Sequence, residues 1–405
     1  MTQIIRTWIE FRSCIAQAMT WVLWFGIATV PVSVAAQTFT TLYQFQFGPD
    51  GATPYSGLIR DAQGNLYGTT TAGGSSKSCL DGCGTVFKLD TAGKETVLHG
   101  FKGTDGANPY AGVIRDSKGN LYGTTLHGGS HGAGTVFRLG SNGKIAILHS
   151  FTAGADGGFP YAGLVRDRSG NLYGTTYLGG KCAAYYGCGT VFQLDSAGQE
   201  TVLYSFQGGD NDGAFPYAGL VRDSKGNLYG TTLGGGDYHC EPNGCGTVFE
   251  VHPNHTEAVL WSFSVTDAFV PYAGLARDAA GNLYGATAGG GPTYGGTLFK
   301  LDPNGQKTTL YAFTQESDGG FPEGTPVRDK AGNLYGTTLQ LGADYVGTAF
   351  RLDPAGNFSV LHAFTGEQDG AMPVAGLILD STGKLYGTTS AGGNDLNGTV
   401  FEITP

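Results

Sequence analysis

Positive charge is scarce in this sequence. Its 405 residues include 23 Lys and Arg against 33 Asp and Glu, and charged residues of both signs make up 14% of the chain. Proteins that bind nucleic acid or an anionic membrane surface rely on clustered Lys and Arg. The composition therefore argues against nucleic acid as a partner, and it leaves contact with a membrane only through an uncleaved hydrophobic leader.

Helical periodicity and catalytic motifs are also missing. After residue 36, no segment repeats its apolar residues with the 3.6-residue period of an amphipathic helix, which argues against helical bundles and α/β folds. The metalloprotease motif HExxH and the phosphate loop GxxxxGK[ST] do not occur. We therefore predict no enzymatic activity, no cofactor and no metal site, although an active site assembled from several repeats would carry no linear motif.

The first 36 residues differ in composition from the rest. Arg6 and Arg12 precede an apolar stretch from about Cys14 to Val30, and small residues at 34–36 follow it. This order is typical of a signal peptide cleaved before Gln37. The apolar stretch also approaches the roughly 20 residues that span a bilayer, so an uncleaved N-terminal membrane anchor is the alternative. Both interpretations predict that residues 37–405 lie outside the cytoplasm, secreted or at the cell surface.

Glycine is abundant, with 70 residues, but it recurs in order rather than in low-complexity runs. The motif GNLYGTT or a near relative occurs seven times at intervals of 51 to 56 residues, with its tyrosine at Tyr67, Tyr122, Tyr173, Tyr229, Tyr284, Tyr335 and Tyr386. A second motif, GTVF or a near relative, follows each copy and ends at Phe87, Phe137, Phe192, Phe249, Phe299, Phe350 and Phe401. Periods of this length are typical of propeller blades.

Each repeat contains four short segments with strand composition, separated by turn residues. In the fourth repeat these are residues 218–223, 227–232, 246–251 and 258–263. Residues 40–45 resemble a fourth segment without its first three, and the chain ends with a third segment at 398–403. We therefore predict an all-β fold: a seven-bladed β-propeller of four-stranded blades, closed by the N-terminal strand that completes the last blade. An open solenoid is the alternative.

The combination of DGAxPYAG, DxxGNLYGTT, GTVF and an LYSF-like strand resembles the bacterial GloVer tandem repeat proteins, also called choice-of-anchor tandem repeat proteins. The resemblance covers residues 40–405. It implies an exported or surface protein without an established molecular activity, and it supplies no catalytic residues. The sequence ends at Pro405 without a hydrophobic tail, so we do not expect a C-terminal anchor. The strand order is also similar to that of NHL-type propellers, which implies that the first strand of each blade lines the channel.

Three loops between the second and third strands are enlarged to 12 or 13 residues, against 8 in the other four repeats. Each enlarged loop holds one cysteine pair: Cys79 with Cys83, Cys182 with Cys188, and Cys240 with Cys245. Paired cysteines in an exported chain favour disulfides, with zinc ligation as the alternative. Insertions on one face of a repeat array often mark its binding face.

Tyrosines follow a recurring proline in the loop before the first strand. They are Tyr55, Tyr110, Tyr161, Tyr217 and Tyr272, with Glu323 and Val374 at the same position in the last two repeats. Tyrosines at a channel mouth can stack on sugar rings and form hydrogen bonds with their hydroxyls. We predict that the five tyrosines and Glu323 bind a ligand. The alternatives are that the tyrosines pack against the neighbouring blade and that Glu323 is a neutral replacement.

Arginine recurs at the end of the first strand, at Arg60, Arg115, Arg166, Arg222, Arg277 and Arg328, with Leu379 in the last repeat. These arginines form either an anion-attracting ring or ion pairs at blade contacts, with acids such as Asp90 or Asp302.

Seven of the eight histidines fall into three groups. Residues His99, His149 and His362 occupy a strand position that is aromatic elsewhere, so we interpret them as packing residues. Residues His127, His131 and His239 lie in loops and are weak metal or catalytic candidates. His255 stands where other turns have glycine, so we expect a strained or altered turn there.

The function that the sequence favours is binding by an exported, monomeric propeller whose partner is a glycan or an extracellular protein. One alternative is an enzyme that acts on an extracellular polysaccharide, a lyase or hydrolase. Another is a structural protein of the cell envelope.

Overall fold

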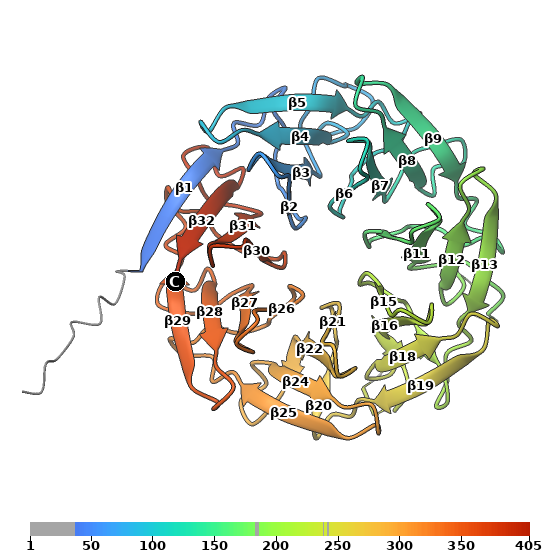
Figure 1. Ribbon diagram of the computed structural model, residues 1–405, viewed down its shortest axis with the longest axis vertical. Helices are drawn as coiled ribbons and strands as arrows, with labels where there is room; N and C mark the ends of the chain where they lie inside the picture. The colour runs from blue at the N-terminus through green and yellow to red at the C-terminus, as the bar shows by residue number, and fades with distance from the viewer. Residues whose placement is uncertain (1–36, 183–185, 238, 241–242) are drawn as a thin grey trace, which may run out of the picture. The chain divides into compact units, whose positions relative to one another are not determined.

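The computed structural model describes residues 37–405 except 183–185, 238 and 241–242, and in this part of the chain seven four-stranded antiparallel sheets form a ring (Figure 1). The prediction of an all-β, seven-bladed propeller is confirmed. The predicted leader, 1–36, lies outside the described residues. Where the chain is described, it contains no helix long and apolar enough to cross a membrane.

Each blade runs from a short strand at the channel to a long strand at the rim. The innermost strands are β2 (Ile59–Arg60), β6 (Ile114–Arg115), β10 (Val165–Arg166), β15 (Val221–Arg222), β21 (Ala276–Arg277), β26 (Val327–Arg328) and β30 (Ile378–Leu379). The second strands are β3 (Leu66–Thr70), β7 (Leu121–Thr125), β11 (Leu172–Thr176), β16 (Leu228–Thr232), β22 (Leu283–Thr287), β27 (Leu334–Thr338) and β31 (Leu385–Thr389).

The third strands are β4 (Thr85–Leu89), β8 (Thr135–Leu139), β12 (Thr190–Leu194), β18 (Thr247–Val251), β24 (Thr297–Leu301), β28 (Thr348–Leu352) and β32 (Thr399–Thr404). The outer strands are β5 (Glu95–Gly100), β9 (Ile145–Ser150), β13 (Glu200–Ser205), β19 (Glu257–Ser262), β25 (Lys307–Ala312), β29 (Phe358–Ala363) and β1 (Thr38–Gln44). Two small loop sheets pair β14 (Gly213–Ala214) with β17 (Gly234–Gly235), and β20 (Ala268–Phe269) with β23 (Gly289–Gly290).

The ring closes as the sequence predicts. Strand β1 pairs antiparallel with β32, with Thr38 opposite Thr404 and Gln44 opposite Thr399. The last sheet therefore has the order β1-β32-β31-β30, in which the first strand of the described chain is the outer strand of the seventh blade. Because this blade is built from both ends of the chain, no incomplete sheet is left at the junction.

The glycine and phenylalanine of the two repeated motifs face each other across the second and third strands. Gly68 is the cross-strand partner of Phe87, and a Cβ on Gly68 would lie 2.7 Å from the Phe87 ring. The same pairing recurs in every blade, and each of these phenylalanine rings is buried. The motifs thus encode a place for one large aromatic side chain in each blade, which packs against the preceding blade, as Phe137 does against Tyr67 and Phe101.

The innermost strands are shorter than predicted. Residues 218–223 were expected as a full strand, whereas β15 contains only Val221 and Arg222. The preceding residues, Tyr217 to Gly219, instead line the mouth of the channel. They leave the sheet because their blade is joined to its neighbour through this segment, as described below.

The aspartate of DxxGNLY shapes the hairpin at the opposite end of the blade. Asp61 accepts hydrogen bonds from the backbone N–H groups of Gln63 and Asn65, from the Asn65 side chain and from the Tyr67 hydroxyl, at 2.8 to 3.0 Å. Burial alone would raise the pKa of Asp61, but these hydrogen bonds outweigh it and hold the pKa below its ordinary value. This aspartate is a structural residue of the turn.

Candidate functional site at the channel mouth

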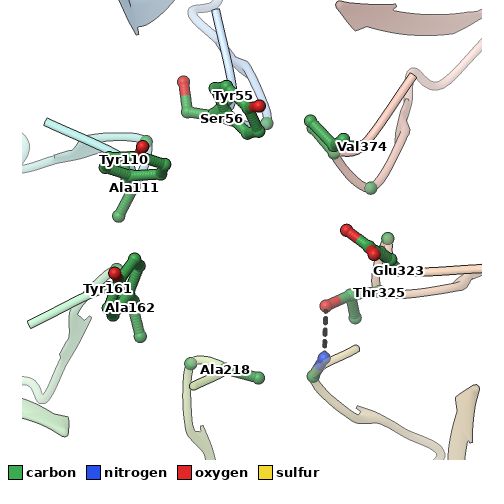
Figure 2. A pocket seen from close by; sticks show the side chains of 18 of the residues that line it. Tyr55, Ser56, Tyr110, Ala111, Tyr161, Ala162, Ala218, Glu323, Thr325 and Val374 are labelled. Carbon is green, nitrogen blue, oxygen red and sulfur yellow. Dashed lines mark hydrogen bonds between the residues drawn. The ribbon is translucent and has the colours of Figure 1, made fainter. Parts of the chain in front are cut away.

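A pocket of about 190 Å³ lies on the propeller axis, and all seven blades contribute to its wall. Each blade supplies a three-residue segment that follows the recurring proline; we call these seven segments the lips. The first residue of each lip is, in chain order, Tyr55, Tyr110, Tyr161, Tyr217, Tyr272, Glu323 and Val374. Figure 2 shows Tyr55, Tyr110 and Tyr161 following one another along one side of the pocket, with Glu323, Thr325 and Val374 on the other side.

The five tyrosines form a continuous row of half-buried rings. Their centroids are 5.1 Å apart for Tyr55 and Tyr110, 5.3 Å for Tyr110 and Tyr161, 4.6 Å for Tyr161 and Tyr217, and 5.1 Å for Tyr217 and Tyr272. Packing against the neighbouring blade and lining the channel were alternative interpretations of the sequence. In the structure the same rings do both, because each ring touches the next lip while it faces the pocket.

Threonines of the GTT motif join six of the seven lips to the preceding blade. Thr175 Oγ1 of the third blade donates to the carbonyl oxygen of Ala218 in the fourth at 3.3 Å. Equivalent bonds link Thr69 to Ala111, Thr124 to Ala162, Thr231 to Ala273, Thr337 to Ala375 and Thr388 to Ser56, at 2.8 to 3.0 Å. These hydroxyls are buried, so each bond fixes the position of a lip relative to its neighbour.

The sixth lip departs from this pattern. The residue of the fifth blade that should hold it is Ala286, which has no hydroxyl to donate. The lip itself reads Glu323, Gly324 and Thr325 where the fourth has Tyr217, Ala218 and Gly219. Its link to the fifth blade runs in the other direction, since the Thr325 hydroxyl accepts a 3.0 Å hydrogen bond from the Gly274 amide (Figure 2).

Glu323 lies in an apolar and aromatic setting. Burial raises its pKa to about 7. Burial also raises the pKa of Tyr217 and of Tyr272, and the charge of Glu323 adds to both shifts. Among the described residues, none forms a hydrogen bond or an ion pair with the Glu323 carboxyl group.

The arginines stack on tyrosines of the preceding blade, and the predicted acid partners Asp90 and Asp302 are wrong. Arg222 lies over the Tyr173 ring of the preceding blade at 5.4 Å, and the other five repeat this stacking at 5.4 to 5.8 Å. Among the six, only Arg60 also forms an ion pair within the described residues, with Asp380 at 3.5 Å. Asp90 and Asp302 instead accept backbone N–H groups in their own turns.

The strand histidines pack as predicted and also form hydrogen bonds. Their Nε2 atoms face aspartates of the following loop: His99 to Asp105 at 3.0 Å, His149 to Asp156 at 3.3 Å, and His362 to Asp369 at 2.9 Å. Tyrosines occupy this place in other blades, as where the Tyr204 hydroxyl donates to Asp212. An aromatic side chain with a polar tip therefore serves one structural role in six blades, whereas Trp261 of the fourth blade has no hydrogen-bond partner for its Nε1 among the described residues.

The loop histidines do not converge. His127 Nδ1 is 3.3 Å from Asn108 Oδ1, His131 Nδ1 is 2.9 Å from Ser130 Oγ, and His239 pairs with Asp237. Within the described parts of the chain no three His, Cys, Asp or Glu side chains gather as a metal site would require. The expectation that catalytic motifs are missing is wrong in one case, because residues 128–132 have the spacing GxSxG. Ser130 nevertheless lies in an exposed loop rather than on the strand-to-helix turn where that motif acts.

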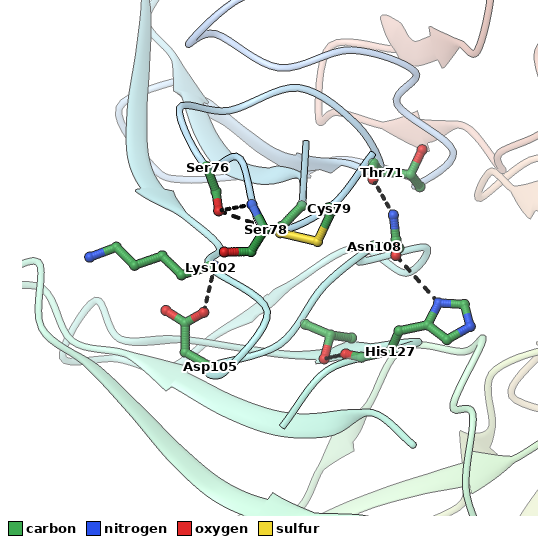
Figure 3. Close-up of a disulfide and its surroundings, with 10 residues drawn as sticks. Thr71, Ser76, Ser78, Cys79, Lys102, Asp105, Asn108 and His127 are labelled. Atoms are coloured by element: carbon green, nitrogen blue, oxygen red, sulfur yellow. Dashed lines mark hydrogen bonds between the residues drawn. A yellow bond between two sulfur atoms is a disulfide. The ribbon is translucent and has the colours of Figure 1, made fainter. Parts of the chain in front are cut away.

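The three predicted disulfides are present: Cys79–Cys83, Cys182–Cys188 and Cys240–Cys245. Each lies in an enlarged loop between the second and third strands of its blade. Figure 3 shows the first of them beside the junction with the second blade, where Asn108 reaches the Thr71 carbonyl at 2.9 Å. The backbone N–H of Asn108 also donates a hydrogen bond to the Cys83 carbonyl oxygen at 2.9 Å. The disulfide thus holds a loop that the next blade uses as a hydrogen-bond acceptor.

Two aromatic residues beside the pocket were not predicted. Tyr177 lies 5.3 Å from Tyr161 and 5.4 Å from Phe215 between ring centroids. With Phe269 and Tyr272 they border a second hollow of about 360 Å³. The sequence held one signal for this: Tyr177 follows the GTT motif at a position where the first two repeats have Thr71 and Leu126.

Comparisons with known proteins identify the repeat and the fold. The model of the Gloeobacter/Verrucomicrobia repeat family matches residues 75–276 and 238–405. No curated protein matches the sequence. The extracellular domain of BT4673 from B. thetaiotaomicron is similar in structure, with a TM-score of 0.58, 11% identity and coverage of 90% of this chain and 39% of that one. The chain therefore spans about two fifths of that relative's length.

A second similar structure is a Bacteroides uniformis protein assigned as a 6-phosphogluconolactonase. Its TM-score is 0.50, its identity is 15%, and the match covers 79% of this chain and 87% of that one. At these identities both likenesses describe the fold alone.

Proposed function

This chain belongs to the Gloeobacter/Verrucomicrobia repeat family, and from that premise we propose that it is an exported propeller that binds a glycan at its channel mouth. The proposal depends on one observation: five tyrosine rings from five consecutive blades stand side by side around a pocket on the axis. Aromatic rings with polar tips offer both stacking surfaces and hydrogen bonds, which suits the mixed apolar and hydroxyl surface of a sugar.

The dimensions of the pocket support a sugar over a protein surface as the ligand. Sites for drug-sized ligands usually enclose about 300 to 1,000 Å³. The central pocket, at about 190 Å³, is smaller and suits a single sugar residue at the end of a chain. The neighbouring hollow beside Tyr177 offers aromatic surface for further residues of the same chain.

Export is supported by the cysteines. All six cysteines between residues 37 and 405 are in disulfides, a bond that persists in oxidising compartments. The leader predicted from residues 1–36 agrees with this, as does the extracellular location of the BT4673 domain. We therefore propose that the propeller works outside the cytoplasm, secreted or at the cell surface.

Binding is favoured over catalysis because the pocket wall is poor in reactive groups. Glycoside hydrolysis ordinarily uses two carboxyl groups. Among the described residues that line the central pocket, Glu323 supplies the one carboxyl.

A glycan array followed by calorimetry on residues 37–405 tests the proposal. We expect Tyr161→Ala combined with Tyr217→Ala to weaken binding of the selected glycan at least tenfold, since stacking surface is lost from two adjacent lips. Tyr345→Ala, a change at an exposed tyrosine in a loop of ordinary length outside the pocket wall, is the matched control. Unchanged affinity in the double variant, or turnover of the glycan, would contradict the proposal.

A further inference from the structure

The central pocket contains one ionisable carboxyl group and no side chain to neutralise it. Among the described residues of the wall, none is Lys, Arg or His. Figure 2 shows the Glu323 side chain extending from its lip toward the middle of the pocket. An ionised carboxylate in such a setting is costly unless a counter-ion is present.

The replacements around Glu323 occur together. The sixth lip has lost the tyrosine, the alanine and the glycine of its siblings, and Pro326 stands where other repeats have an apolar side chain such as Leu220. The fifth blade has also lost the threonine that would hold this lip, at Ala286. Thr325 supplies a new bond to Gly274 in its place. A neutral change at one position would not require a rebuilt connection to the neighbouring blade.

The chemistry of the wall selects a positive group. The faces of tyrosine rings carry negative electrostatic potential and attract cations, Tyr less strongly than Trp. A carboxylate adds a full negative charge on the opposite side, so an acidic sugar would be repelled. A calcium ion takes six to eight oxygen ligands, more than one carboxylate on this wall provides. An organic cation with N–H donors matches both the carboxylate and the phenol hydroxyls, which accept hydrogen bonds.

We infer that the group entering this pocket is the primary ammonium of an amino sugar, with Glu323 as its counter-ion and the tyrosine rings as its walls. The inference rests on the proposed glycan-binding function and specifies the sugar. Tyr217 and Tyr272 are the titratable groups whose charges couple to Glu323, and both stay neutral in the range where the carboxyl ionises.

The test compares three tetrasaccharides on residues 37–405 by calorimetry: a glucosamine tetramer, its fully N-acetylated counterpart, and the matching glucose tetramer. The wild-type protein is expected to bind the free amine about tenfold or more tightly than either neutral sugar, in line with the strength of hydrogen bonds to charged groups. Glu323→Gln is expected to abolish this preference and to keep the affinity for the neutral sugars. Glu316→Gln, at an exposed glutamate outside the pocket, should change neither.

The outcomes separate the two levels of the argument. Equal binding of all three sugars that is lost in the Tyr161 and Tyr217 variant overturns the amino-sugar inference and leaves glycan binding standing. If Glu323→Gln still prefers the free amine, the amino-sugar inference is also overturned. The same holds if the wild-type protein binds calcium and Glu323→Gln does not. Failure of the wild type to bind any of the three sugars, while it binds another glycan of the array, overturns the amino-sugar inference alone. Failure to bind any glycan of the array as well overturns both proposals.

Discussion

The Thr388 hydroxyl, in the last blade, donates a hydrogen bond of 2.9 Å to the backbone carbonyl of Ser56, in the first, across 332 positions of sequence. This bond closes the ring near the channel, and the pairing of β1 with β32 closes it at the rim. The equivalent threonine of five other repeats joins its own blade to the following one in the same way. Closure of the ring and placement of the tyrosine lips therefore depend on one repeated interaction.

Replacement of Thr388 by valine tests this link. Valine keeps the shape of threonine but leaves the Ser56 carbonyl without its donor, and an unsatisfied buried polar group costs about 1 to 3 kcal/mol. We expect the free energy of unfolding in urea to fall by about that amount. Thr388→Ser keeps the hydroxyl and should recover most of the loss. Equal stability of the valine variant and the wild type would show that the bond does not contribute.

Three half-buried glutamates make stability depend on pH. Burial, and then the charge of Asp212, raises the pKa of Glu257 to about 8 from an ordinary 4.5. Glu95 and Glu200 are raised to about 7, chiefly by burial. Since the folded state favours the protonated acid, its contribution to stability is complete below about pH 4.5 and is lost as pH rises to about 8. We expect the free energy of unfolding to decrease over that window.

The fifth blade contains a natural control for this effect. Lys307 stands at the position of these glutamates and pairs with Asp267 at 2.6 Å. Glu257→Gln should flatten the pH dependence, and Glu257→Lys should stabilise the protein at pH 8, because the new cation would face Asp212 as Lys307 faces Asp267. Urea titrations at several pH values measure both. A variant that keeps the wild-type slope would assign the pH dependence to other groups.

The disulfides are expected to protect loops rather than the ring. The Cys79–Cys83 bond closes a sequence separation of 4 residues, so it restricts the unfolded chain far less than the roughly 3 kcal/mol expected for a loop of 15. Cys79→Ser combined with Cys83→Ser should leave the melting temperature within a few degrees and hasten proteolytic cleavage at 76–82. Limited proteolysis with mass spectrometry locates the cut. A large loss of melting temperature with no new cleavage would contradict this role.

The repeats were sufficient to predict the fold because each motif residue has a local task. Gly68 makes room for Phe87 on the adjacent strand, and Asp61 closes the hairpin that leads into Tyr67. Such contacts lie within one blade and recur seven times, so spacing alone indicates them. Closure could be predicted for the same reason, since residues 40–45 supply the strand that the last repeat lacks.

Contacts between blades could not be predicted from spacing. Arg222 was expected to meet an acid but lies over Tyr173, 49 positions earlier, because the offset between neighbouring sheets decides which side chains meet. The shortening of the first strand has the same origin, since the Ala218 carbonyl bonds to Thr175 of another sheet. At the channel mouth, the sequence indicated the tyrosines and Glu323 but not Tyr177. The contact between Tyr177 and Tyr161 depends on the distance between two loops of the third blade, which the spacing of motifs does not give.

His255 stores strain that a single substitution can release. It was expected to strain or alter its turn, and the turn is kept: the His255 amide donates to the His252 carbonyl at 2.9 Å, as Gly305 does to Asp302. The cost is a φ of 66° for His255, a left-handed conformation that disfavours side chains by about 1 to 2 kcal/mol. His255→Gly should therefore raise the free energy of unfolding by up to about 1 kcal/mol, after the greater freedom of glycine in the unfolded chain is subtracted. His255→Ala keeps a Cβ and should gain little, and equal stability of the glycine and alanine variants would show that the backbone is not strained there.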